Sequence, residues 1–119
     1  MAIAVGSASN TPTFGTRANS TITAPSGITN GDVLVAVLFV GNSSLTPATV
    51  TPPAGWAEVP NSPTTHSKSS GGSYSIAVHV YRKVASGESG NYTFTHSSSD
   101  TEGYMYRLTG VDATTPIDV

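Results

Sequence analysis

The apolar run at residues 33–40, VLVAVLFV, constrains the fold of this chain more than any other stretch. It follows the turn-forming pair Asn30-Gly31 and stops before Gly41, so it has the length of a strand and is far too short to span a membrane as a helix. A strand with one solvated face would alternate apolar and polar side chains, whereas this run has no polar position. The run therefore predicts a strand that is either covered on both faces or meets a partner with one of them.

The remainder of the chain reads as short strands between turn signals. It holds 12 Gly and 8 Pro and is rich in Ser and Thr, a composition that favours strands and turns over helices. We therefore predict an all-β fold, an antiparallel β-sandwich of jelly-roll or immunoglobulin-like type with seven to eight strands. Polar stretches at 6–20, 61–72 and 96–103 are interpreted as an arm and two loops. Further strands are predicted at residues 2–5, 21–23, 48–51, 56–59, 73–84, 91–95 and 104–108.

The length of 119 residues predicts one compact domain. We expect an N-terminal strand and polar arm at residues 1–20 and a β-sandwich domain at residues 21–119. The last residues, Ile117-Asp118-Val119, read as the start of a strand, and an unpaired strand edge favours addition of another chain. Segment 110–119 is therefore predicted to form an interface in a homo-oligomer, either a dimer or a trimer.

Alternation within the later strands predicts which side chains point inward. Tyr92 and Phe94 are expected to face the core. The same reasoning places four of the five tyrosines inward and leaves only Tyr81 outward. The residues expected to share a face are Tyr74, Ile76, Val78 and Val80 in one strand, and Tyr104, Tyr106 and Leu108 in another.

The stretch PPAGW, residues 52–56, predicts a structural corner. Pro53 cannot donate a backbone hydrogen bond, so the preceding strand must end there. Gly55 is expected to reverse the chain, and Trp56 is expected to plug the core at the corner.

Composition gives no indication of a cofactor or of a charged partner. Cysteine is absent, which excludes disulfides and thiolate sites, and the net charge of −2 with 10% charged residues provides no basic surface for nucleic acid or a membrane. The first ten residues do not resemble a signal peptide. No metal-ligand spacing occurs among the histidines. We therefore predict no catalytic residue, no cofactor and no metal.

The ionisable residues are interpreted as loop, strand-end or interface groups. His66 and His96 fall in the two polar loops, and His79 is expected to point outward or into an interface. A small hydrolase using Glu88, Asp100 or Glu102 stays open as an alternative, because glycosidases need two carboxylates across a cleft.

Four stretches agree in order and spacing with a known module. They are APSGITNGDVLVAVLFV, TPPAGWAEV, VYRKVASGESGNYTFT and YMYRLTGVDATTPIDV. Together they resemble a β-sandwich module of bacteriophage structural proteins, found in capsid decoration and tail proteins, and of some bacterial surface proteins. The resemblance covers nearly all of the chain after Ser20. It implies a virion component or adhesion module without catalysis or cofactor, and in longer members the chain continues beyond the Pro-Ile-Asp stretch.

The expected function is that of a phage capsid decoration (cement) protein, which stabilises the capsid through intersubunit contacts. Its partners would be the major capsid protein and copies of itself, and its location the virion, assembled in the host cytoplasm. The interface residues that we expect are Ala2, Ile3, Val5, Ile117 and Val119.

The alternative is a carbohydrate-binding, receptor-recognition module of a phage tail or capsid surface. Its expected glycan contacts are the outward Tyr81 and the loop histidines His66 and His96.

Overall fold

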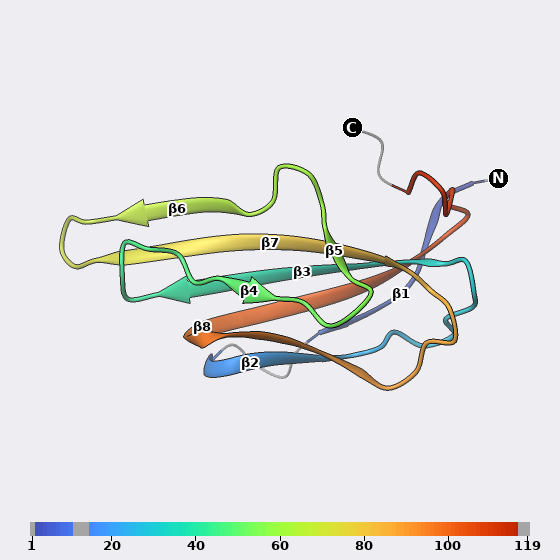
Figure 1. The fold of residues 1–119 in the computed structure, drawn as a ribbon, viewed down its shortest axis with the longest axis horizontal. Coiled ribbons are helices and arrows are strands. Elements are labelled where there is room, and N and C mark those ends of the chain that lie inside the picture. Colours follow the sequence, from blue (N-terminus) through green and yellow to red (C-terminus); the bar gives the residue numbers. More distant parts are fainter. Residues whose placement is uncertain (1, 11–14, 117–119) are drawn as a thin grey trace.

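The chain is built entirely from strands, as the prediction of an all-β fold requires. A computed structural model describes residues 2–10 and 15–116, and none of these residues is helical. It follows that no described helix could cross a membrane. In chain order the strands are β1 (Ala4–Asn10), β2 (Gly15–Thr23), β3 (Val33–Asn42), β4 (Val50–Thr51), β5 (Ala57–Glu58), β6 (Thr64–Lys68), β7 (Tyr74–Val84) and β8 (Asn91–Thr109) (Figure 1).

All the strand pairs are antiparallel and belong to one eight-stranded sheet with the order β1-β8-β3-β7-β5. Strands β2 and β4 also pair with β8, and β6 pairs with β7. The 19-residue β8 holds the fold together, because its first half pairs with β2 and β4 while its second half pairs with β1 and β3. One buried cluster contains side chains from β2, β3, β7 and both halves of β8. The sheet therefore curls around a single core, which is compatible with a β-sandwich.

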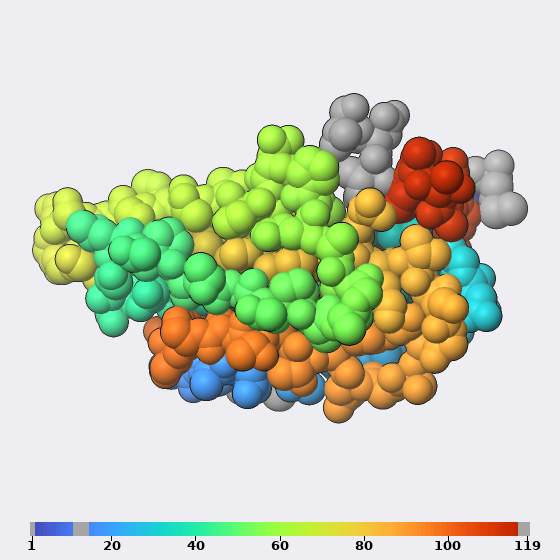
Figure 2. Space-filling view, viewed as in Figure 1, coloured from blue at the N-terminus to red at the C-terminus, as the bar shows by residue number. Residues whose placement is uncertain are grey.

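The molecule is elongated, with extents of 50 × 30 × 22 Å. The N-terminal end of β1 and the segment after β8 lie at one end of the long axis (Figure 1). The turn between β6 and β7 and the loop after β3 form the narrow opposite end (Figure 2). The latter is called the distal end below.

The predicted corner at Trp56 is confirmed. Gly55 adopts a φ of 86°, a conformation that favours glycine, and the backbone N–H of Trp56 donates to the carbonyl of Pro53 at 3.3 Å. Trp56 is only 7% exposed. Its ring meets those of Tyr92 and Phe94 edge-on, with centroids 5.1 and 5.5 Å away. The tryptophan therefore closes the core between the β4–β5 connection and the first half of β8.

The polar stretches expected as an arm and as loops contain strands. β1 and β2 occupy most of residues 4–23 and both pair with β8, so the described part of the predicted arm belongs to the sheet. β6 lies within the predicted loop 61–72 and pairs with β7. The predicted loop 96–103 is the middle of β8. These strands were not predicted because their side chains are mostly polar. A sheet that buries only one face accepts polar residues, so polarity alone does not exclude a strand.

A bulge in β8 explains why the tyrosine faces were predicted wrongly. Opposite β2, the register jumps from Arg17 paired with Ser99 to Asn19 paired with Thr95, so β8 holds two extra residues there. The buried positions are even-numbered up to residue 96 and odd-numbered from residue 99 onward. Because the side chains of a strand alternate, this shift turns Tyr104 and Tyr106 to the outer face and buries Met105.

The faces of β7 are also the reverse of the prediction. Tyr81 is 1% exposed, whereas Tyr74 is 41% exposed. Pairing with β3 sets this choice, since Tyr81 lies opposite Ala36, whose small side chain leaves room for a large one. The Tyr81 ring also packs at 5.3 Å from that of Phe94. Tyr81 is therefore a core residue, and the prediction that it points outward is wrong.

A partly buried ion pair fixes the start of β3. Asp32 Oδ2 accepts from Arg107 Nε at 2.7 Å, from the Thr29 backbone N–H at 2.8 Å and from Thr29 Oγ1 at 3.0 Å. Burial favours the neutral acid, but the hydrogen bonds from Thr29 and Arg107 outweigh it and lower the pKa of Asp32. The pair ties the β2–β3 turn to the second half of β8.

Candidate functional site

The face of the sheet turned away from the core carries apolar side chains on three neighbouring strands. All of them are partly exposed. An antiparallel sheet with a solvated face usually presents polar side chains there. This surface, called the outer apolar face below, consists of Val35, Val37 and Phe39 on β3, Val78 and Val80 on β7, and Tyr104 and Tyr106 on β8.

The strand register brings these side chains into continuous rows. Val37 lies between Tyr104 on β8 and Val80 on β7, and Phe39 lies opposite Val78. The rings of Phe39 and Tyr104 meet edge-on, with centroids 6.5 Å apart. The rows make a patch that crosses β8, β3 and β7. Contiguous exposed apolar surface of this kind is typical of protein-interaction sites.

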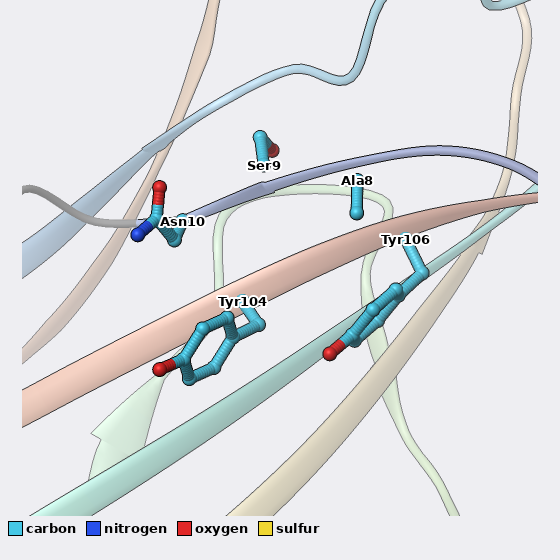
Figure 3. A pocket seen from close by; sticks show the side chains of 5 residues that line it. All are labelled: Ala8, Ser9, Asn10, Tyr104 and Tyr106. Atoms are coloured by element: carbon cyan, nitrogen blue, oxygen red, sulfur yellow. The ribbon is translucent and has the colours of Figure 1, made fainter.

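A shallow hollow of about 180 Å³ lies beside the outer apolar face, between β1 and β8. Its walls are Ala8, Ser9 and Asn10 of β1 with Tyr104 and Tyr106 of β8, and Figure 3 shows the two tyrosine rings side by side on β8. The Tyr104 hydroxyl donates to Glu102 Oε1 at 2.5 Å, which raises the pKa of Tyr104. The hollow extends the apolar surface to the edge of the sheet.

The N-terminal interface residues predicted from the sequence are exposed. Ile3 is 67% exposed and Val5 is 64% exposed, and Ala2 is exposed as well. They lie at and just before the start of β1, which ends the strand order of the sheet. Ile117 and Val119, the other two predicted interface residues, lie outside the described residues.

The structure does not support the glycan-contact set predicted from the sequence. Tyr81 and His96 are buried, at 1% and 6% exposure. His66 is exposed, but it stands on β6 opposite Ile76. Two of the three side chains therefore have no surface to offer to a sugar.

His96 belongs to a buried polar cluster that sequence reasoning missed. Ser20 Oγ lies 3.0 Å from His96 Nε2 and 3.0 Å from Thr101 Oγ1, and His96 Nδ1 lies 2.8 Å from the Ser97 carbonyl. A hydroxyl at this distance from an imidazole resembles a nucleophile and its base. However, Ser20 and Thr101 are both 0% exposed. A substrate has no access, so the cluster serves to satisfy polar groups inside the sheet.

His79 is also buried, at 4% exposure, and does not point outward as predicted. Its Nδ1 lies 2.8 Å from Glu58 Oε1 and 3.3 Å from the Tyr81 hydroxyl. Ser62 Oγ donates to the same Glu58 oxygen at 2.8 Å. Burial, and secondarily the Glu58 charge, raise the pKa of Tyr81. The Ser62 hydroxyl is hydrogen-bonded to the Glu58 carboxylate and not to the His79 imidazole. The three groups therefore do not form a nucleophile–base pair.

The acidic residues considered for hydrolysis are used in separate contacts. Glu88 Oε1 is 2.8 Å from Lys83 Nζ, and its other oxygen accepts from the Tyr92 hydroxyl. Burial opposes these hydrogen bonds but is outweighed, so the pKa of Glu88 is lowered. Asp100 accepts from Thr16, and Glu102 from Tyr104. Within the described residues, no three His, Asp or Glu side chains gather as a metal site would require.

Comparison with protein-family models, curated proteins and solved structures finds no match for this chain.

Proposed function

We propose that the chain is a non-enzymatic virion structural protein, a phage capsid decoration subunit that acts through intersubunit contacts. The observation that carries the proposal is the outer apolar face, in which seven apolar side chains on β3, β7 and β8 remain partly exposed. Such a face gains free energy when a protein partner covers it, at roughly 25 cal/mol per Å² of apolar surface removed from water. Its partners in this proposal are the major capsid protein and copies of the chain.

Low charge and a rigid sheet are consistent with a purely interfacial role. The net charge is −2, so long-range electrostatic attraction would contribute little to docking, and apolar contact would provide most of the affinity. A decoration subunit binds at many equivalent positions, so a modest free energy at each contact is multiplied over the particle. This supports stabilisation of a capsid without any catalytic step.

The exposed start of β1 offers a second contact within the same proposal. Val5 lies on the edge strand β1 and Ile3 just before it, and Ala4–Asn10 contains neither a charged residue nor a proline. Natural sheets usually protect such an edge with lysine, proline or a covering segment. The strand is therefore suited to pair with an extended segment of a neighbouring subunit.

Replacing Val37 with aspartate tests the outer apolar face. The charge stands in the middle row between Tyr104 and Val80, so it should prevent self-association while leaving the core intact. Light scattering over a dilution series should show a dimer or trimer for the natural chain and a monomer for the variant. The control is Thr95→Asp, which places the same charge at an exposed position on the first half of β8. Circular dichroism establishes that both variants are folded.

Analysis of purified phage particles tests whether the chain is a virion component. Purified particles of the phage that encodes the chain should contain it in many copies, and the Val37→Asp variant should be depleted from them. A natural chain that is monomeric at every concentration and missing from purified particles would refute the proposed function.

A further inference from the structure

A second pocket, of about 130 Å³, lies at the distal end of the molecule, beyond the outer apolar face. The end of β3, the start of β7 and the bulged part of β8 converge there with the start of β2. Tyr74 supplies an aromatic ring, and Asn42, Ser99, Asp100 and Thr16 supply polar groups. The pocket is lined mainly by polar groups, so it would suit a polar ligand that also has a face able to pack against one aromatic ring.

Gly41 makes room for the tyrosine in this pocket. A Cβ placed on Gly41 would lie 2.2 Å from the Tyr74 hydroxyl oxygen, which is far inside van der Waals contact. Tyr74 is 41% exposed, so its ring is held over the glycine while part of it still meets solvent. A larger residue at position 41 would displace the ring. The absence of a side chain at Gly41 therefore allows the Tyr74 ring to lie over β3 at this position.

The polar groups of the pocket have unused hydrogen-bonding capacity. Ser99 is 3% exposed and its Oγ has no partner among the described residues, which is costly for a buried hydroxyl. Asp100 Oδ1 accepts from Thr16 Oγ1, which orients the carboxylate, and Oδ2 has no hydrogen-bond donor among the described residues. Asn42 Nδ2 donates to the Thr46 carbonyl at 3.0 Å, and within the described part of the chain the amide oxygen has no donor. A ligand rich in hydroxyl groups would satisfy the Asp100 and Asn42 oxygens, whereas Ser99 Oγ is fully buried on the core-facing side of β8 and lies out of its reach.

The charges of the pocket narrow the class of ligand. Asp100 is the only charged residue among the described residues that line it, so an anion would be repelled. A hard divalent cation takes about six to eight oxygen ligands, commonly from several carboxylates. Among the described residues that line this pocket, Asp100 supplies the single carboxylate. A neutral sugar ring has an apolar face for the tyrosine and hydroxyls for the carboxylate and the amide.

We propose that the distal pocket binds one neutral hexose unit of a polysaccharide, with Tyr74 packing against the sugar ring and Asp100 and Asn42 hydrogen-bonding its hydroxyls. This site is distinct from the Tyr81, His66 and His96 set predicted from the sequence. It goes beyond the proposed capsid role and does not depend on it, because no residue of the outer apolar face lines the pocket.

Binding to a panel of immobilised neutral polysaccharides (glucans, galactans and mannans) tests this site. The natural chain should bind at least one of them. Asp100→Asn should weaken that binding by about tenfold or more, because a hydrogen bond to a charged acceptor is lost. Tyr74→Ala should have an effect of similar size. Tyr104→Ala is the matched control, since it removes an exposed tyrosine of the outer apolar face and should leave binding unchanged.

A titration with methyl glycosides of glucose, galactose and mannose, followed by amide chemical shifts, detects weaker binding and locates it. Shifts confined to Gly41, Tyr74 and residues 98–100 are expected. Gly41→Ala should abolish them, and preserved shifts elsewhere in its spectrum would show that the variant is folded. Absence of shifts with all three glycosides together with a flat polysaccharide panel would overturn the proposal. Equal binding by the natural chain and the Asp100→Asn and Tyr74→Ala variants would also overturn it.

Discussion

The free energy of unfolding is expected to fall by about 3–5 kcal/mol when Trp56 is replaced by alanine. Trp56 is 7% exposed and meets Tyr92 and Phe94 edge-on, so the substitution would leave a cavity lined by two aromatic rings. These rings are held by strand pairing with β2 and cannot collapse far into the space. Urea unfolding followed by circular dichroism measures the loss.

Two further variants show whether the loss comes from the cavity. The indole N–H of Trp56 has no partner among the described residues, so Trp56→Phe should keep most of the ring contact without losing a hydrogen bond. It is expected to cost clearly less than Trp56→Ala, because it removes only part of the ring volume and leaves a smaller cavity. Leu45→Ala, at a side chain that is 46% exposed, should change stability by less than about 0.5 kcal/mol. If Trp56→Ala cost no more than Leu45→Ala, the corner would not be part of the core.

Replacing Asp32 with asparagine is expected to lower stability at neutral pH by about 3 kcal/mol. Removing one partner of a buried ion pair costs about 3–5 kcal/mol, and the lower end applies because Arg107 keeps 19% of its side chain exposed. Asparagine can still accept from Thr29 but leaves the Arg107 charge without a counter-ion. The fluorescence of Trp56, the single tryptophan, reports unfolding in urea.

The effect of Asp32→Asn should depend on pH with a defined sign. The folded-state pKa of Asp32 is lowered, since the hydrogen bonds from Thr29 and Arg107 outweigh burial. The stabilisation is therefore fully present above the ordinary aspartate pKa of about 3.9 and is lost as the pH falls through the folded-state value. The difference between the natural chain and the variant should shrink over that acidic range. Glu88, whose pKa is also lowered, is common to both proteins and cancels in the comparison.

Asp112→Asn is the matched control for this charge change. Asp112 is exposed and accepts from Thr114 and Thr115 within its own turn, so its replacement should have little effect on unfolding. A pH-independent loss in Asp32→Asn, or an equal loss in both variants, would show that the Asp32–Arg107 pair does not stabilise the fold as inferred.

Local patterns in the sequence were sufficient to predict the fold class and the corner. The valine-rich run became the buried, central strand β3, and the Pro53–Trp56 stretch became the expected plug, because both depend on neighbouring residues alone. The continuous run left two alternatives open, a strand covered on both faces or one that meets a partner with one face. Its outer positions Val35, Val37 and Phe39 are partly exposed, so the chain itself does not cover both faces completely.

The faces of β7 and β8 could not be predicted because they depend on long-range register. The bulge in β8 is apparent only when β2 is placed beside it, and residues 96–98 include no glycine or proline that would indicate a bulge in the sequence. Tyr81 was misplaced because its face of β7 also carries Ser75, Ala77 and His79 and is the less apolar one, whereas pairing with β3 places it against Ala36 in the core. The distal pocket was missed for a related reason. Gly41, Tyr74 and Asp100 are far apart in the chain and meet only through the sheet.

The length of β8 has a consequence for how the molecule comes apart. Its 19 residues supply the pairing partner for strands in both halves of the sheet, and no other described strand has that reach. If β8 separated from the strands that pair with either of its halves, the core that both halves share would also be lost. The domain is thus expected to open as a single cooperative unit, in which backbone amides of β3 and β8 exchange with solvent only through global unfolding.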